Sequence, residues 1–291
     1  MELQHLKAFL LVAEHHSFSA AAEALHLTQP AVSKRVAALE EQFGTPLFDR
    51  IGRQVSLTEA GKALLPHADA IARRLDQARQ SVEDLSGDVT GRLRLATSHH
   101  IGLHRLPPVL RQFSEDYPGV ALDIDFMDSE LAYDEINRGR AEIAVVTLAP
   151  VIDDSLVAES IWPDPLDFMA TSGHPLLDQR DVSLAQLCEH PVILPGSGTY
   201  TGQIVRQLFD DQGLKLDVAL STNYLETIRM MASVGLGWTL LPRSMLQPPL
   251  QPLAVPAVAP ARTLGLIYHR RRSLSNAAQA FAALLKPGNR A

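Results

Sequence analysis

Patterns typical of strands and of helices alternate from Arg92 to the end of the chain, and this alternation restricts the fold more than any other feature. Short apolar runs predict strands, and the longer stretches between them predict helices. Such alternation indicates an α/β region, of one unit or two lobes, whose sheets are covered on both faces. The predicted strands are LRLAT, VALDIDF, EIAVVT, PLDFMA, PVILP, DVAL, WTLLP and LGLIY, and the predicted helices are 107–117, 130–138, 201–212, 225–234 and 275–286.

The composition fits a globular protein of about two domains. Of the 291 residues, 46% are hydrophobic and 20% are charged, which excludes a disordered chain. The single cysteine, Cys188, cannot form a disulfide within the chain, which favours a reducing compartment. No apolar run approaches the roughly 20 residues of a membrane helix, and the amino terminus lacks a secretory signal pattern. We therefore expect a cytoplasmic protein with no membrane partner.

Charge is unevenly distributed along the chain. The 26 Lys and Arg against 33 Asp and Glu give a net charge of −7, which argues against nucleic acid as a partner of the whole surface. DNA binding depends on local patches, however, and basic residues gather between positions 28 and 54. These basic residues are Lys34, Arg35, Arg50 and Arg53.

The first 56 residues contain short helical patterns. Ser19 is a candidate N-cap for a short helix, and the run HLTQP then interrupts the pattern. Thr28 is an N-cap candidate for the next helix, where Pro30 is tolerated in the first turn, and Gly44 is a natural end. On this helix we expect a buried face and an outward face, formed respectively by Val32, Val36, Leu39 and Phe43 and by Ser33, Lys34 and Ala37.

Two short helices joined by a tight turn suit a helix-turn-helix, whose second helix would enter the DNA major groove by its amino terminus. An ordinary helical hairpin with a polar face fits the spacing equally well. The run LFDRIGRQVSLT adds a second feature, because it predicts two short strands around residues 51–53. These strands would form a wing that carries Arg50 and Arg53.

A long helix is predicted from Thr58 to about Leu85. Two apolar series with a spacing of seven form a heptad seam, which is a dimerisation signal. The alternative is a surface helix packed on its own domain. Pro66 should kink this helix or remove one hydrogen bond, and Gly87 and Gly91 mark a linker. The two series are Gly61, Ala68, Leu75 and Val82, and Leu57, Leu64, Ile71, Ala78 and Leu85.

The run FSAAAEALHLTQPAVSKRVAALEEQFGTPLFDRIGRQVSLTEAG resembles the DNA-binding region of LysR-type transcriptional regulators, nearly continuously over residues 1–66. The later runs GRLRLATS, NRGRAEIAVV, HPLLDQRDVSLAQL and LETIRMMASVGLGWTLLP are consistent with this family. The resemblance implies a multidomain α/β protein with a winged helix-turn-helix at 1–57 and a dimerising linker helix at 58–88. It also implies a two-lobed, periplasmic-binding-protein-like effector domain at 91–291, with lobe I at about 91–162 and 266–291 and lobe II at about 163–265.

The resemblance also implies partners and contact residues. The partners are double-stranded promoter DNA, a small-molecule inducer, further copies in a dimer and homotetramer, and RNA polymerase if the protein is an activator. No cofactor other than the inducer is expected. Gln29 could read an adenine edge, Lys34 could reach a guanine or a phosphate, and Arg35 ranks lower because it could face an acidic neighbour. The DNA-contacting residues that the resemblance implies are Thr28, Gln29, Pro30, Ser33, Lys34, Arg50 and Arg53.

Two predicted strand-to-helix junctions carry hydroxyl groups where a helix dipole would attract an anion. One is ATSHH and the other is PGSGTYTGQ, and the resemblance places both at one cleft between the lobes. The inducer is therefore predicted to be a small anion such as sulfite or sulfate, or a short carboxylate. The alternative for each hydroxyl is simple helix capping. The predicted effector-binding residues are Thr97, Ser98, His99, His100, Thr147, Ser197 and Thr199.

Three motifs of enzymes and nucleotide-binding proteins are incomplete in this sequence. GSGTYTG departs from the nucleophile elbow, PGSGTYTGQ lacks the P-loop lysine, and VGLGW lacks the third glycine of a dinucleotide fingerprint, so we expect no enzyme. The alternative function is a metal- or redox-sensing transcription factor that uses His99, His100 and His104. No cysteine or carboxylate lies nearby in sequence to complete a tetrahedral metal site, and Cys188 is expected to be a buried structural thiol.

Overall fold

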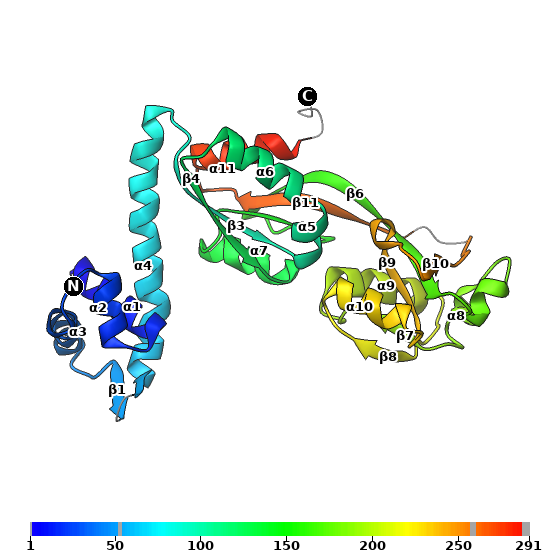
Figure 1. Cartoon of the computed structure of the whole chain (residues 1–291), viewed down its shortest axis with the longest axis horizontal. Coiled ribbons are helices and arrows are strands. Elements are labelled where there is room, and N and C mark those ends of the chain that lie inside the picture. The colour runs from blue at the N-terminus through cyan, green and yellow to red at the C-terminus, as the bar shows by residue number, and fades with distance from the viewer. Residues whose placement is uncertain (1, 52–53, 257–259, 287–291) are drawn as a thin grey trace. The chain divides into compact units, whose positions relative to one another are not determined.

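The computed structural model describes residues 2–51, 54–256 and 260–286, and it divides into two compact units, residues 1–86 and 87–291 (Figure 1). The first unit contains a helical bundle, a two-stranded sheet and a long helix. Its elements are α1 (Leu3–His15), α2 (Phe18–Ala24), α3 (Gln29–Phe43), β1 (Phe48–Ile51), β2 (Gln54–Leu57), α4 (Glu59–Glu83) and the 3₁₀ turn η1 (Asp84–Ser86).

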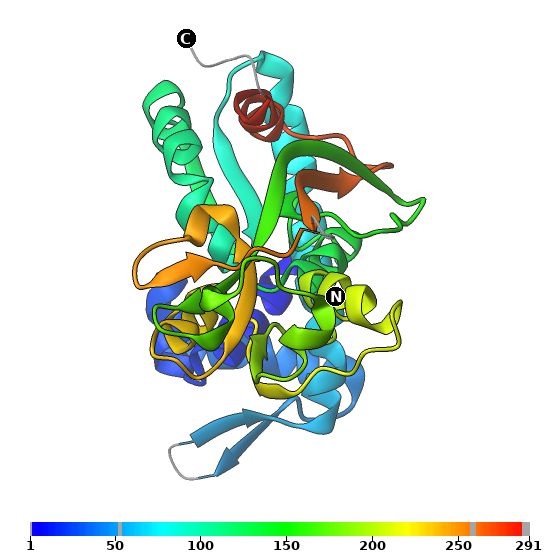
Figure 2. The same cartoon turned by 90° about the vertical axis from the view of Figure 1, so that its right-hand side faces the viewer.

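Three aromatic rings hold the core of the first unit together. The Phe48 ring lies 5.3 Å from Phe9 of α1 and 5.8 Å from Phe18 of α2, measured between ring centroids. Because Phe48 begins β1, these contacts fix the base of the wing against the helices. The antiparallel pair β1–β2 then extends away from that helical core, as Figure 2 shows.

The helix-turn-helix has the predicted elements, with two local corrections. The N-cap of α2 is Ser17, not Ser19, and its hydroxyl accepts the Ala20 amide at 3.3 Å. Phe43 is 48% exposed because it is the last residue of α3, beyond the buried face formed by Val32, Val36 and Leu39. Gly44 ends α3 as predicted, with a φ of 66°, a left-handed conformation that glycine adopts without strain.

The heptad seam of α4 has two environments. Gly61 and Ala68 are buried in the first unit's own core, and Leu64 is partly buried beside them. A Cβ atom at Gly61 would lie 2.2 Å from the Leu47 carbonyl oxygen, so only glycine permits this close approach. Towards the end of α4, Val82 is 68% exposed. The alternative of a helix packed on its own domain therefore describes the start of α4, and α4 runs through Pro66 without a break.

The second unit is built on an extended sheet in the strand order β4-β3-β5-β11-β6-β9-β7-β8, with β10 paired to β6. The strands are β3 (Gly91–Thr97), β4 (Val120–Phe126), β5 (Ile143–Thr147), β6 (Leu156–Thr171), β7 (Val192–Leu194), β8 (Val218–Ser221), β9 (Trp238–Pro242), β10 (Leu250–Pro252) and β11 (Ala261–His269). The helices are α5 (His99–His104), α6 (Pro107–Asp116), α7 (Ser129–Arg138), α8 (Leu184–Leu187), α9 (Tyr200–Asp210), α10 (Leu225–Ser233) and α11 (Asn276–Leu285), with 3₁₀ turns η2 (Pro175–Asp178) and η3 (Arg243–Met245).

Strand β6 is shared between two lobes. Its first part pairs with β11 as far as Pro165, and its second part pairs with β9 from Leu166 onward. Lobe I comprises β4, β3, β5, β11 and the start of β6, whereas lobe II comprises the end of β6 with β9, β7, β8 and β10. The predicted strand PLDFMA is only the lobe II part of β6, because pairing with β11 carries the strand through Trp162 and its neighbours.

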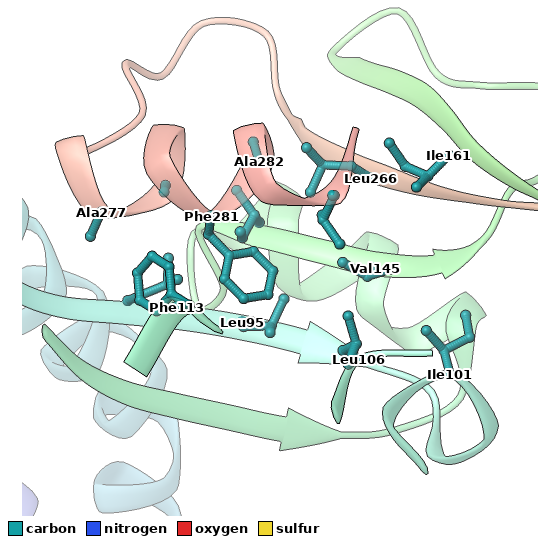
Figure 3. Close-up of a cluster of buried hydrophobic side chains, with 14 of the residues drawn as sticks. Leu95, Ile101, Leu106, Phe113, Val145, Ile161, Leu266, Ala277, Phe281 and Ala282 are labelled. Atoms are coloured by element: carbon teal, nitrogen blue, oxygen red, sulfur yellow. The ribbon is translucent and has the colours of Figure 1, made fainter. Parts of the chain in front are cut away.

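Lobe I has its own core between the sheet and the helices on one face, as Figure 3 shows. Leu95, Val145 and Leu266 project from β3, β5 and β11, and Phe281 of α11 meets Phe113 of α6 with ring centroids 5.2 Å apart. Lobe II has separate cores, one of them centred on Trp238 of β9. Each lobe therefore has its own apolar core, and the polar side chains at the junction of the lobes are not part of either core.

Candidate functional site

The outward face of α3 is a polar surface next to its amino terminus. Thr28, Gln29, Pro30 and Lys34 are exposed, and Ser33 is half-buried. The Gln29 side-chain amide donates to the Ser33 hydroxyl at 3.1 Å, which links two of the predicted DNA contacts. Thr28 occupies the N-cap position, but its side chain makes no capping hydrogen bond in the described part of the chain.

Two further charged residues of α3 have structural partners. Arg35 donates to the side-chain carbonyl of Gln4 at 2.8 Å, so it is directed towards α1 and not along the polar surface. Glu40 accepts the backbone amides of Leu47 and Phe48 at 2.8 and 3.3 Å. The Glu40 carboxylate is therefore engaged with the start of the wing. Among the outward residues Ser33, Lys34 and Ala37, Lys34 carries the charge, and it is exposed.

Of the two arginines predicted for the wing, only Arg50 lies within the described residues. Arg50 lies in β1 with its backbone paired to Val55 of β2. Arg53 lies outside the described residues. Both assignments to DNA therefore stay predictions.

A pocket of about 50 Å³ lies between the two lobes of the second unit. The start of α5, the start of α7 and the end of β5 line it from lobe I, and the starts of α9 and α10 line it from lobe II. Strand β11 contributes one side chain. The lining residues are Ser98, His99, His100, Asp128, Ser129, Glu130, Thr147, Pro195, Thr199, Thr201, Asn223, Leu225 and Arg262.

Most of the predicted effector residues line this pocket, but two do not. Thr97 is fully buried, and its hydroxyl donates to the Val145 carbonyl at 2.8 Å, which joins β3 to β5. Ser197 is exposed and is not a lining residue. Thr199 lines the pocket, yet its hydroxyl also caps α9 by accepting the Gly202 amide at 3.0 Å. Ser98 is the N-cap of α5, and its side chain makes no capping hydrogen bond within the described residues.

A buried arginine forms one wall of the pocket. Arg262 of β11 is 7% exposed; its Nε donates to Asp164 at 2.8 Å and its Nη1 donates to the Thr201 hydroxyl at 2.7 Å. Asp164 is shared, because Arg105 donates to its other oxygen at 3.0 Å. Two guanidinium groups therefore compensate a single buried carboxylate. The Nη2 atom of Arg262 is buried and has no hydrogen-bond partner among the described residues. Such a donor is costly unless a ligand accepts from it.

His100 lies beside this arginine and is neutral. Burial, together with the positive charge of Arg262, lowers its pKa to about 3. Neither ring nitrogen has a partner in the described part of the chain. Because one nitrogen of a neutral imidazole donates and the other accepts, His100 offers the pocket one of each. The ring of His99 instead lies 4.9 Å from that of Tyr224 across the lobe junction.

Two carboxylates from the start of α7 also line the pocket. Asp128 accepts the Asn223 side-chain amide at 2.6 Å, and Glu130 accepts the backbone amide of Tyr200 at the start of α9. Burial raises the pKa of Glu130. Neither carboxylate forms an ion pair with a described residue. Both hydrogen bonds join lobe I to lobe II, and His104 of α5 adds a third link by pairing with Glu226 of α10 at 2.5 Å.

The metal- and redox-sensing alternative finds no support in this geometry. Among the described residues, no group of three or more His, Cys, Asp or Glu side chains could hold a metal ion. Cys188 is half-buried, and burial raises the pKa of its thiol, which disfavours the reactive thiolate. In the part of the chain that is described, no helix has the length and apolar character needed to cross a bilayer.

Several pocket residues were not predicted from the sequence. Asp128 and Asn223 come two and three residues after the predicted strands VALDIDF and DVAL, so the rule that ligands bind at strand carboxyl ends could have identified them. Arg262 and Asp164 had no comparable signal, because each lies within a strand and becomes part of the site only through the pairing of β11 with β6.

Comparisons with known proteins cover both units. The family model for the bacterial regulatory helix-turn-helix protein of the lysR family matches residues 3–62, and the model for the LysR substrate binding domain matches residues 86–290. The HTH-type transcriptional activator CmpR of Synechocystis is 31% identical over 96% of this chain and 93% of its own. An uncharacterized HTH-type regulator of Azotobacter vinelandii is 65% identical over 37% of this chain and 75% of its own.

A similar full-length structure is that of CbnR in complex with its target DNA. It is 22% identical, has a TM-score of 0.72, and covers 98% of this chain and 99% of its own, which shows the shared fold. The polar start of α3, the wing and the two-lobed second unit are thus found together in one architecture. The chain belongs to the LysR family of DNA-binding transcriptional regulators, with an amino-terminal helix-turn-helix domain and a carboxyl-terminal effector-binding domain.

Proposed function

We propose that this regulator binds promoter DNA in the cytoplasm and responds to a small anion, such as sulfite, sulfate or a short carboxylate, held between the lobes of residues 91–291. The observation that carries the ligand assignment is that Arg262 lines the pocket while its buried Nη2 has no hydrogen-bond partner among the described residues. The effector contacts come from Ser98, His99, His100, Thr147 and Thr199, together with Arg262. A pocket of about 50 Å³ suits a small ion better than an aromatic compound.

In the first unit, residues 1–57 supply the DNA contacts. Gln29 and Ser33 read base edges, Lys34 contacts a base or a phosphate, and Thr28 and Pro30 support the helix start. Arg50 and Arg53 contact the backbone from the wing. The exposed end of the heptad seam, including Val82 and Leu85, supports dimerisation through residues 58–88. The dimers pair into a homotetramer, and an activator of this type contacts RNA polymerase.

A gel-shift assay tests the two halves of this proposal together. The full chain is mixed with the DNA fragment directly upstream of its own gene, with and without sulfate, sulfite or acetate. We expect a retarded complex whose mobility or affinity changes with at least one anion. Retardation equal to that of random DNA contradicts the DNA assignment. A specific complex that no anion alters contradicts the effector assignment.

A further inference from the structure

We infer that the pocket takes a small zwitterion, a ligand whose carboxylate faces Arg262 and whose ammonium group faces Asp128 and Glu130, as an α-amino acid would. This inference rests on the proposed function, because it places an anionic group at the same arginine. It adds a second requirement, a cationic group at the two carboxylates from the start of α7. The pocket is therefore lined by charges of both signs.

Arg262 is the buried cation that lines the pocket. It shares Asp164, which is 1% exposed, with Arg105, so two guanidinium groups face one carboxylate, and the neutral His100 adds no further charge. The Nη2 donor of Arg262 is buried and has no hydrogen-bond partner among the described residues. A buried donor without an acceptor is unfavourable, so a ligand anion that accepts from this guanidinium gains a strong, charge-assisted hydrogen bond.

The α7 wall has an excess of negative charge. Asp128 and Glu130 both line the pocket. Asp128 accepts from the Asn223 side-chain amide, and Glu130 accepts from the backbone amides of Tyr200 and of Glu130 itself, so all of these donors are neutral. A carboxylate can accept several hydrogen bonds, so both retain acceptor capacity after these contacts. Among the described residues neither carboxylate has a cationic partner within ion-pair distance, and the charge of Arg262 acts on Glu130 only from beyond that distance. A ligand cation beside them would supply the close partner that they lack.

The two walls select between classes of small ligand. A dianion such as sulfate would satisfy Arg262 but would bring two negative charges towards Asp128 and Glu130, and like charges at close range repel. A zwitterion adds no net charge and places each of its charges at the wall of opposite sign. Its size is also suitable: at roughly 10–15 Å³ for each water-sized group, the pocket of about 50 Å³ holds a compact molecule.

Calorimetric titration of the full chain with probes built on related carbon skeletons tests this inference. L-Alanine carries both charges, L-lactate replaces the ammonium by a hydroxyl donor, propionate has only the carboxylate, and ethylamine has only the ammonium. Sulfate represents the dianion. We expect alanine to bind at least about tenfold more tightly than propionate or sulfate, with lactate between them, because a buried polar wall rejects an analogue that leaves it unpaired.

Variants assign the preference to the α7 wall. Asp128→Asn and Glu130→Gln keep the side-chain shape and remove the charge, so each should weaken alanine by about tenfold and leave propionate unchanged or improved. Glu115→Gln is the matched control, because Glu115 is an exposed carboxylate of α6 that does not line this pocket. It should alter none of the affinities. The ranking of probes with the wild-type chain decides the inference even if a variant fails to fold.

The outcomes separate this inference from the proposed function. If propionate or sulfate binds as tightly as alanine, the zwitterion inference is wrong and the anion pocket stands. If none of the anionic or zwitterionic probes binds, the anion pocket itself is wrong, and the inference is overturned with it. An unchanged alanine affinity in both Asp128→Asn and Glu130→Gln also overturns the inference.

Discussion

The polar surface of α3 and the pocket between the lobes differ in how the chain assembles them. The predicted α3 contacts come from one stretch, residues 28–34, whose spacing alone puts them on one helix face. The pocket residues come from positions between 98 and 262 and from both lobes. The first site can thus change without disturbing the fold, whereas several residues of the second also hold the lobes together.

The hydrogen bonds of the two sites differ in burial and in the sequence distance that they span. On the α3 surface, the contact between Gln29 and Ser33 is exposed and local. In the pocket, Arg262 reaches Thr201 of α9 and Asp164 of β6, and both contacts are buried. Stability and ligand binding should therefore be coupled in the pocket and separate on α3.

The largest expected effect is that of Arg262→Met on the stability of the second unit. Removing this guanidinium breaks a buried ion pair and leaves the Thr201 hydroxyl without its donor, so the free energy of unfolding should fall by about 3 kcal/mol. Both tryptophans, Trp162 and Trp238, lie in this unit, so their fluorescence during urea unfolding reports on it.

Arg243→Met is the matched control for that substitution. Arg243 also pairs with an aspartate, Asp167, through two hydrogen bonds of 2.9 and 3.0 Å, but its side chain is 66% exposed. Exposed ion pairs contribute little, and the unfolding curve should therefore hardly move. Equal shifts for the two variants would mean that the buried cluster is not special.

On α3, Gln29→Ala should lose sequence discrimination by about 1–3 kcal/mol and change stability by less than about 0.5 kcal/mol. Fluorescence anisotropy with the upstream fragment and with random DNA measures the ratio of affinities. Lys34→Ala is the comparison, and if Lys34 contacts phosphate, it should weaken both DNAs alike and reduce the salt dependence by about one charge. Identical behaviour of the two variants on both DNAs would contradict the separate roles.

The smallest expected effect is a pH dependence from His100. Its pKa is about 3 in the folded chain and 6.5 for an unperturbed histidine, because burial and Arg262 disfavour the charged ring. The stability it contributes is present above pH 6.5 and is lost as the pH falls towards 3, since only the unfolded chain binds the proton. Between about pH 7.5 and 5.5 this loss is roughly 1.4 kcal/mol.

His100→Gln, which does not titrate, tests this expectation. Tryptophan-monitored urea unfolding of the variant should lose about 1.4 kcal/mol less stability than the wild-type chain over the same pH range. Parallel pH profiles for the two proteins would show that His100 is charged, or exposed to solvent, in the folded state. A fully exposed His100 would also remove the contrast between the pocket and the α3 surface.

The sequence alone predicted the elements with a strong local signal. The spacing of Val32, Val36 and Leu39 identified the buried face of α3, and Gly44 identified its end. Where the signal was local but ambiguous, the prediction failed in part: the heptad spacing of α4 could not show that Gly61 lies against the Leu47 carbonyl. Ser17 and Ser19 are both acceptable caps by type, and Ser17 is the cap because the helix begins at Phe18.

The sequence by itself determined the family, the order of the units and the helix face that is expected to meet DNA, because periodicity and caps act over a few neighbouring residues. Only the tertiary structure decided which side chains meet at the pocket. Arg262 and Asp164 come together because β11 pairs with β6 in antiparallel register. Asp128 and Glu130 meet Asn223 and Tyr200 because hydrogen bonds join the two lobes at the pocket. Such contacts join residues distant in sequence, and no local pattern encodes the register that brings them together.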